Sequence, residues 1–330
     1  MSIRLAILGA TGLVGQTMLN ILQERGDYLD EISLFASSRS AGKEVSFKGK
    51  TYPIKELTEE ALREEKFDYV LSALDSHLAT RYIPVAKEAG AVVIDNSSAY
   101  RMAQDVPLVV PEVNPEDAFK NQGIIANPNC STIQSVVALA PILKTYGLKR
   151  IVYVTYQAVS GSGVEGIADL ERGIQGQENT LYPHPIAYNI LPHIDDFLDT
   201  GYTKEEMKMI DESQKIFHLP DLAITATAAR VPVKGGHAVA INAETQKPVD
   251  LEELRDLYRK TEGIVLQDDP QEKLYPMPLY AEGEDPVFVG RLRLDPSLEN
   301  GLNLWCVADN IRKGAALNAI QILELLIQKN

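Results

Sequence analysis

One cysteine in this sequence is placed as a nucleophile would be. Cys130 lies in the segment 127–132, Asn-Pro-Asn-Cys-Ser-Thr, between a short apolar strand and an apolar helix predicted over about 132–146. Ser131 and Thr132 favour a helix start, so we expect Cys130 just ahead of a helix N-terminus. Unpaired N–H groups and the positive end of the helix dipole lower the pKa of a thiol there and make it more nucleophilic. The alternative is a small buried residue, as most free cysteines are, and position alone does not decide between the two.

A glycine-rich turn near the N-terminus has the spacing of a dinucleotide site. An apolar strand predicted over 3–8 runs into Gly-Ala-Thr-Gly-Leu-Val-Gly at 9–15, and a helix follows to about Arg25. Glycines in such a turn let the backbone approach a pyrophosphate, which binds at the helix N-terminus. The flanking strand and helix favour a ligand over a plain tight turn. The expected cofactor contacts are Gly9, Thr11, Gly12, Leu13 and Val14.

The residues after the second predicted strand, 32–36, bear on the choice of cofactor. NAD sites place Asp or Glu there to bind the ribose 2′-hydroxyl, whereas this sequence has Ser37, Ser38, Arg39 and, further on, Lys43. Hydroxyls and a guanidinium suit a 2′-phosphate, which a carboxylate would repel. We therefore expect NADP. The alternative, that Arg39 and Lys43 are solvated loop charges, is a serious rival for Lys43.

The elements that position these residues alternate between strand and helix. Strands predicted over 68–74 and 91–96 are separated by a helix over about 78–89, which predicts a doubly wound parallel sheet. Ser72 then falls at the carboxyl end of a strand, where such sheets bind ligands. A strand-like segment follows over 106–114.

After about residue 150 the pattern changes to long strands rich in β-branched and aromatic residues. They predict a mixed, mostly antiparallel sheet with strands over 151–158, 222–233, 237–245, 287–294 and 302–307. The first strand ends in a flexible small-residue loop, 157–163, and residues 178–202 form a long loop of the kind that is usually functional or an interface. Helices are predicted after a capping box that starts at Thr203, over about 250–261, and from 314 to about 327 with an amphipathic stripe.

Composition indicates a soluble globular protein of about two domains. The chain has 330 residues, of which 45% are hydrophobic and 24% charged, and no apolar run reaches the roughly eighteen residues of a membrane helix. Residues 1–5 enter a strand pattern and do not resemble a signal peptide, so we expect a cytoplasmic protein. Two cysteines are too few for a disulfide framework, and no zinc spacing is present, so no metal is expected. The net charge of −14 argues against nucleic-acid or anionic-membrane partners.

Six motifs in this order together resemble one family, the aspartate-semialdehyde dehydrogenases. They are Gly-Ala-Thr-Gly-Leu-Val-Gly (9–15), Arg-Ser-Ala-Gly-Lys (39–43), Asn-Pro-Asn-Cys-Ser-Thr (127–132), Gln-Ala-Val-Ser-Gly-Ser-Gly (157–163), Arg-Val-Pro-Val-x-x-Gly-His (230–237) and Asp-Asn-Ile-Arg-Lys-Gly-Ala-Ala (309–316). The resemblance runs almost from end to end. It implies reductive dephosphorylation of L-4-aspartyl phosphate to L-aspartate 4-semialdehyde with NADPH, in the biosynthesis of lysine, threonine and methionine.

The resemblance also implies residue roles. Cys130 would expel phosphate from the acyl phosphate and form a thioester, because a carboxylate is a poor hydride acceptor. His237 would be the acid/base, since a histidine can move a proton near neutral pH. Gln157 would orient the acyl group, and Arg230 would bind the substrate α-carboxylate.

Further contacts carry over by motif. Glu205 and Lys208, at i,i+3, would serve the substrate amino group and the phosphate, although that spacing also suits a surface ion pair. Glu205 is preferred to Glu206 because of its spacing to Lys208. Arg101 and Asn129 match phosphate-binding positions. The cofactor contacts implied by the resemblance are Ser160, Gly161, Gly163, Asn310 and Lys313.

The implied fold combines α/β and α+β architecture. Residues 1–127 with 312–330 would form a Rossmann-type NADP-binding domain with a doubly wound parallel sheet. Residues 128–311 would form a catalytic and dimerisation domain with a mixed, mostly antiparallel sheet. The last helix would return to the first domain, and the partner would be a second copy in a homodimer, with a tetramer as an alternative.

Three rival functions remain. The nearest is a sister reductase acting on N-acetyl-γ-glutamyl phosphate, whose cysteine is usually flanked by Gly and Tyr, where this chain has Asn129 and Ser131. A non-catalytic cofactor-binding relative would tend to lose the cysteine. A cysteine hydrolase would leave the glycine turn unexplained.

Overall fold

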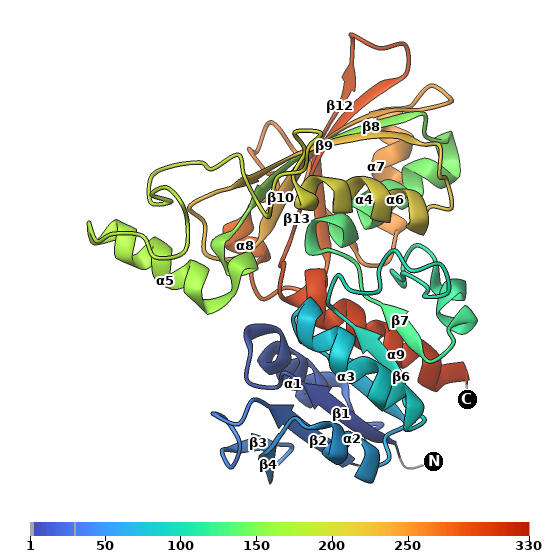
Figure 1. The fold of residues 1–330 in the computed structure, drawn as a ribbon. Coiled ribbons are helices and arrows are strands. Elements are labelled where there is room, and N and C mark those ends of the chain that lie inside the picture. Colours follow the sequence, from blue (N-terminus) through green and yellow to red (C-terminus); the bar gives the residue numbers. More distant parts are fainter. Residues whose placement is uncertain (1–2, 30, 330) are drawn as a thin grey trace. The chain divides into compact units, whose positions relative to one another are not determined.

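The computed structural model of the chain describes residues 3–29 and 31–329. It divides into two compact units, one made of residues 1–128 with 315–330 and the other of residues 129–314 (Figure 1). The predicted domain limits at residues 1 and 330, and the first two residues of the strand pattern predicted from residue 1, lie outside the described residues. Each unit is built on its own sheet.

The first unit contains a seven-stranded sheet in the order β3-β4-β2-β1-β5-β6-β7. Its strands are β1 Arg4–Leu8, β2 Glu31–Ala36, β3 Glu44–Phe47, β4 Lys50–Glu56, β5 Tyr69–Ser72, β6 Val92–Asp95 and β7 Ile124–Ala126. All neighbouring strands are parallel except β3 and β4, which form a hairpin. Central strands such as β1 are buried on both faces, which explains their continuous apolar sequence. The predicted doubly wound parallel sheet is confirmed.

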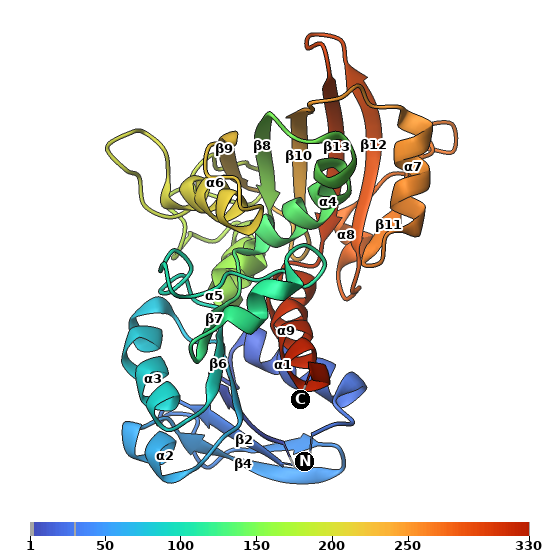
Figure 2. The same cartoon turned by 90° about the vertical axis from the view of Figure 1, so that its right-hand side faces the viewer.

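Helices cover both faces of this sheet. They are α1 Leu13–Arg25, α2 Glu59–Glu64, α3 Ser76–Glu88 and α9 Leu317–Lys329. α1 packs beside α9 on one face, and α2 packs beside α3 on the other (Figure 2). The apolar stripe of α9, with Ile320 and Leu323, joins Leu5 and Ile7 of β1 in one core, as its pattern predicts.

The segment 106–114 is not a strand. Only Leu108 forms a bridge, to Ala126, and the rest of the segment is irregular. Pro107 and Pro111 lack the N–H group that a ladder of hydrogen bonds between strands requires. The segment therefore does not form a continuous strand, although its apolar sequence is typical of one.

The second unit contains a six-stranded sheet in the order β11-β12-β13-β10-β8-β9. Its strands are β8 Arg150–Gln157, β9 Ala223–Arg230, β10 His237–Glu244, β11 Ile264–Leu266, β12 Val287–Asp295 and β13 Gly301–Ala308. The three central pairings are antiparallel and the two outer ones are parallel, so the predicted mixed sheet is confirmed. β9 and β10 are joined by a short connection but do not form a hairpin, because β8 lies between them.

The helices of the second unit are α4 Cys130–Tyr146, α5 Gly163–Ile174, α6 Lys204–Ile216, α7 Leu251–Lys260 and α8 Pro278–Ala281. α4, α6 and α7 pack on one face of the sheet (Figure 2). The predicted flexible loop 157–163 is instead a 3-10 turn, Val159–Ser162, that leads directly into α5. Short 3-10 and π-helical turns also cover Pro115–Lys120 and Arg312–Ala316. Across the described ranges, no helix combines the length and apolar character needed to cross a membrane.

Candidate active site

Cys130 is the first residue of α4, which begins two residues before the predicted start at about residue 132. The N-cap is Asn129, whose Oδ1 accepts hydrogen bonds from the N–H groups of Ser131 at 3.0 Å and Thr132 at 3.3 Å. Asn is among the strongest N-cap residues, which explains why the helix begins before Ser131 and Thr132. Cys130 itself is half-buried, and it lies at the positive end of the helix dipole.

Gly314 lies against the side of Cys130. A Cβ built on Gly314 would be 2.9 Å from the Cβ of Cys130, closer than two side-chain carbons can approach. Gly314 belongs to the π-helical turn Arg312–Ala316. The turn therefore leaves room for the cysteine only because it carries no side chain at this position.

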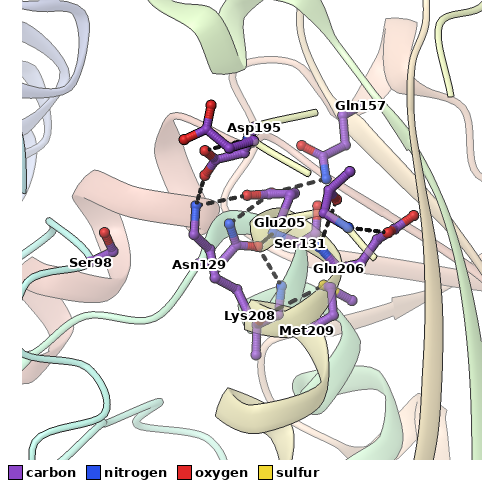
Figure 3. Close-up of polar contacts among 12 residues, drawn as sticks. Ser98, Asn129, Ser131, Gln157, Asp195, Glu205, Glu206, Lys208 and Met209 are labelled. Carbon is purple, nitrogen blue, oxygen red and sulfur yellow. Dashed lines mark hydrogen bonds and ion pairs between the residues drawn. The ribbon is translucent and has the colours of Figure 1, made fainter. Parts of the chain in front are cut away.

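Glu205 contacts Asn129, the N-cap of α4, and two other predicted site residues (Figure 3). Its Oε1 accepts hydrogen bonds from Nδ2 of Asn129 at 2.9 Å and from Nε2 of Gln157 at 3.1 Å. Its Oε2 accepts from Nζ of Lys208 at 3.1 Å. The structure thus brings Asn129, Gln157, Glu205 and Lys208 into one cluster.

The Glu205 carboxylate is ionised although it is buried. Burial by itself would raise the pKa of Glu205, but the Lys208 ammonium and the amide donors of Asn129 and Gln157 outweigh it, so the pKa lies below its ordinary value. The pKa of Lys208 is raised in turn, because Glu205 and Asp195 outweigh the opposing effect of its partial burial. Both groups therefore carry charge near neutral pH.

The neighbouring Glu206 has a different task. Its Oε2 accepts the N–H of Thr203 and the Thr203 hydroxyl accepts the N–H of Glu206, which completes the predicted capping box of α6. Its Oε1 accepts the N–H of Ala228 at 3.0 Å. Because both oxygens of Glu206 are used in this way, Glu205 is the acid of the pair that faces Asn129 and Gln157.

His237, at the start of β10, is fully buried. Its Nδ1 accepts the N–H of Ala158 at 3.0 Å, while its Nε2 has no hydrogen-bond partner among the described residues. Burial first, and the nearby Arg230 second, lower the pKa of His237 well below its ordinary value. The ring is therefore neutral at pH 7, with its proton on Nε2.

Arg230, at the end of β9, lies beside His237. Its Nη1 donates to the carbonyl oxygen of Ala158 at 2.8 Å, and strand pairing sets it opposite Gln157. A Cβ built on Gly161 would be 2.7 Å from Nη1 of Arg230 and 3.3 Å from Nε2 of His237. Gly161 therefore keeps this space open.

The other predicted cofactor residues of the second unit are Ser160, Gly163, Asn310 and Lys313. Ser160 and Asn310 exchange hydrogen bonds between Oγ and the side-chain amide, and Oδ1 of Asn310 also accepts the N–H of Gly236 at 3.0 Å. Gly163 begins α5 with φ of 72°, a left-handed conformation that favours glycine. Lys313 is buried in the same π-helical turn as Gly314.

In the first unit, the glycine turn between β1 and α1 is shaped by close backbone contacts. A Cβ on Gly9, whose φ is 81°, would lie 2.7 Å from the carbonyl oxygen of Ala73, and a Cβ on Gly15 would overlap the carbonyl oxygen of Gly9. Gly12 is the N-cap of α1 and provides no side-chain hydrogen bond. Thr11, Leu13 and Val14 stand around this open helix end.

The other predicted cofactor residues of the first unit follow neighbouring parallel strands. Ser37, Ser38 and Arg39 are exposed after β2, and Ser72 ends β5, which like β2 pairs with β1. Because the carboxyl ends of parallel strands meet at one edge of a sheet, these residues share the edge that carries the glycine turn.

Arg101 is also buried in the first unit. Its Nε donates to the carbonyl oxygen of Asn127 at 2.9 Å and its Nη2 to that of Asn96 at 2.7 Å. Much of its guanidinium is therefore used to hold backbone at the ends of β6 and β7.

Sequence reasoning missed two carboxylates near the cysteine turn. Oε2 of Glu212 accepts the N–H of Asn129 at 2.7 Å, and Oδ2 of Asp195 accepts from Nζ of Lys208 at 2.7 Å. Glu212 follows Glu205 by seven residues on α6, a spacing that places both on one helix face and could have been noticed. Asp195 stands in a loop, where no such spacing exists. Nowhere in the described residues do three or more acidic, His or Cys side chains gather as a metal site would require.

Two family models match the chain. The family model described as semialdehyde dehydrogenase, NAD binding domain, matches residues 4–121. The model described as semialdehyde dehydrogenase, dimerisation domain, matches residues 139–313. Each match covers most of one unit.

Individual relatives match over the whole length. An aspartate-semialdehyde dehydrogenase of Aquifex aeolicus is 51% identical over 100% of this chain and 99% of its own. The crystal structure of aspartate semialdehyde dehydrogenase II of Vibrio cholerae complexed with ASA has a TM-score of 0.95 and 46% identity, with 99% of each chain covered. The enzyme of Candida albicans, solved with NADP, has a TM-score of 0.78 and 27% identity over 100% of this chain and 99% of that one. This chain belongs to the aspartate-semialdehyde dehydrogenase family.

Proposed function

We propose that this protein converts L-4-aspartyl phosphate to L-aspartate 4-semialdehyde and phosphate with NADPH, as a step in lysine, threonine and methionine biosynthesis. The observation that carries the proposal is the position of Cys130 at the N-terminus of α4, next to the buried cluster of Asn129, Gln157 and Glu205. The family membership of the chain supports the substrate.

Cys130 is the proposed nucleophile. The helix end favours its thiolate, which attacks the acyl carbon and forms a C–S bond while the C–O bond to phosphate breaks. The product of this step is a thioester on Cys130. We assign to Gln157, whose Nε2 donates to Glu205, the task of orienting the acyl group.

His237 is the proposed acid/base. Since Nδ1 accepts the Ala158 N–H, Nε2 is the atom available to share or move a proton with the reacting oxygen. Gly161 leaves space next to this atom and next to Arg230. We assign to Arg230 the α-carboxylate of the substrate, because a guanidinium can bind a carboxylate through two N–H groups.

The other substrate contacts are assigned by charge. Glu205, an ionised and buried carboxylate, suits the substrate ammonium, and Lys208 suits the phosphate. Asn129 and Arg101 are proposed for the phosphate as well, although both already make hydrogen bonds within their own units.

The first unit fits a dinucleotide. Gly9 and Gly15 let the backbone of the turn pack closely at the α1 N-terminus, and Gly12 leaves that helix end without a side-chain cap. We propose that Gly9, Thr11, Gly12, Leu13, Val14 and Ser72 bind the dinucleotide and that Ser160, Gly161, Gly163, Asn310 and Lys313 bind its nicotinamide half. When bound, NADPH supplies the hydride that reduces the thioester. Exposed Ser37, Ser38 and Arg39, with no acid among them, favour NADP, and the Candida albicans relative was solved with NADP.

We propose a homodimer, with a tetramer as the alternative. Residues of β8 and β13 that face away from α4, such as Tyr156 and Trp305, are only partly buried, and a hollow of about 500 Å³ lined by Tyr275, Met277 and Trp305 lies on this face. The dimerisation-domain match covers these strands. Light scattering should give a multiple of the 36.4 kDa chain mass, and a monomer would contradict the proposal.

The test of the function is reduction of NADP with L-aspartate semialdehyde, which should require inorganic phosphate. Cys130→Ala should abolish the rate while the protein stays folded, and Cys306→Ala, which removes the buried cysteine of β13, should retain it. Activity only with N-acetylglutamate semialdehyde would favour the sister reductase. Binding of NADP without turnover on either substrate would favour a non-catalytic protein.

A further inference from the structure

Lys208 is held by two carboxylates rather than one (Figure 3). Its Nζ lies 3.1 Å from Oε2 of Glu205 and 2.7 Å from Oδ2 of Asp195. Two of the three N–H donors of the ammonium are thus directed at acidic partners. An anion that approaches Lys208 meets two negative charges around one positive charge.

The two carboxylates are held differently. The Glu205 side chain is 7% exposed, and its other oxygen accepts from Asn129 and Gln157. The Asp195 side chain is 32% exposed, and its other oxygen accepts the N–H of the next residue, Asp196. Asp195 is therefore the partner of Lys208 that can be replaced, whereas Glu205 is fixed.

The backbone at Asp195 points to the same conclusion. Asp195 has φ of 67°, in the left-handed region that Asp and Asn adopt in turns more often than other non-glycine residues do. It lies in the long irregular stretch between α5 and α6, where the bridges of Leu191 to Arg230 and Phe197 to Thr203 are isolated. A residue in an irregular segment can move at lower cost than a residue in a helix.

We propose that Asp195 is a specificity-determining residue that competes with the phosphate group of the substrate for Lys208. The inference rests on the proposed function, in which Lys208 binds phosphate. Without substrate, the Asp195 carboxylate is paired with the Lys208 ammonium. When inorganic phosphate or the acyl phosphate binds, the phosphate group replaces the Asp195 carboxylate at Lys208. Glu205 keeps its own ion pair and holds Lys208 in place. Asp195 thereby weakens the binding of anions that have no other contacts in the site.

The variant that tests this is Asp195→Asn. The change removes the charge, keeps an oxygen for the Asp196 N–H, and places at this backbone position a residue that also tolerates left-handed φ. The matched control is Asp196→Asn on the same loop. Asp196 pairs with Lys204 at 2.6 Å, and both of those side chains are more than half exposed.

The measurement is the KM for inorganic phosphate in the direction of NADP reduction, at constant ionic strength. Asp195→Asn should lower this KM roughly fivefold, the worth of one partly exposed ion pair, with little change in kcat or in the KM for NADP. Asp196→Asn should leave the KM for phosphate within about twofold of wild type, because exposed pairs contribute little. An unchanged or raised KM for phosphate in Asp195→Asn would overturn the inference, since it would mean that Asp195 only positions Lys208.

A second measurement separates this inference from the proposed function. Inorganic phosphate should protect Cys130 from alkylation by iodoacetamide, and this protection requires no turnover. If wild type shows no phosphate-dependent turnover, the proposed function fails. The inference then stands if half-protection needs less phosphate in Asp195→Asn than in wild type, and it fails if the two proteins need the same amount.

Discussion

The N-terminus of α1, which we assign to cofactor binding, and the N-terminus of α4, which carries the proposed nucleophile, are built in opposite ways. α1 begins after Gly12, and its turn is shaped by glycines that allow backbone to touch backbone. α4 begins after Asn129, whose side chain caps the helix and donates to a buried carboxylate. The first turn works because side chains are missing, and its N–H groups stay available to a ligand. The second works because side chains are present, and they fix the position of Cys130.

The strongest test of this contrast is a side chain added to the α1 turn. Gly15→Ala should lower the unfolding free energy by about 3 kcal/mol and weaken NADPH binding by roughly a hundredfold or more, because its Cβ would overlap the Gly9 carbonyl. Urea unfolding and fluorescence titration with NADPH measure the two effects. Gly12→Ala is the control for stability, since its Cβ would make an ordinary contact of 3.5 Å. If Gly15→Ala bound NADPH as tightly as wild type does, the absence of side chains in the α1 turn would not be what allows the cofactor to bind.

The matching test removes a side chain from the α4 turn. Asn129→Ala should cost about 1–2 kcal/mol of stability through loss of the cap, and it should also lower the phosphate-dependent rate. Asn129→Ser keeps an oxygen that can cap the helix but loses the amide that donates to Glu205. We expect the Ser variant to regain most of the stability and little of the rate. If its rate equals that of wild type, the contact between Asn129 and Glu205 has no role in catalysis.

A smaller difference concerns pH. Because burial and Arg230 depress the pKa of His237 in the folded protein, the unfolded chain binds a proton below about pH 6.5 that the folded chain does not. Stability from this residue is present above that pH and is lost as pH falls, by roughly 1 kcal/mol between about pH 7 and about pH 5.5. Urea unfolding as a function of pH should show a shallower slope in His237→Gln than in wild type.

The sequence predicts correctly those structural elements that depend only on residues close to one another along the chain. The capping box at Thr203 and the glycine turn at 9–15 depend on neighbours within a few residues, and both form as expected. The prediction of a strand over 106–114 was wrong because its prolines lack the N–H groups that strand pairing requires, although its apolar character suggests a strand. The start of α4 was misjudged because Asn129, Ser131 and Thr132 all favour a cap, and only the folded turn shows which oxygen accepts the N–H groups.

Long-range arrangement could not be read from local pattern. The sequence shows β9 and β10 as strands joined by a short turn, but the insertion of β8 between them depends on the whole sheet. Motif spacing pointed to Glu205, Lys208, Gln157 and Asn129, and their contacts agree with a shared site. Asp195 contacts Lys208 from a loop, where no spacing could mark it, whereas Glu212 contacts Asn129 from two turns after Glu205, a spacing that the sequence does contain.

The position of α9 has a consequence for the order in which the protein is made. Its residues Leu317, Ile320 and Leu323 complete the core around Leu5 and Ile7, yet they are synthesised after the entire second unit. At ordinary rates of translation, the first strands wait on the order of tens of seconds for the helix that covers them. During that interval α1 alone covers this face of the nascent sheet and part of its apolar surface stays open, so we expect the ribosome-bound chain to be a client for a holding chaperone.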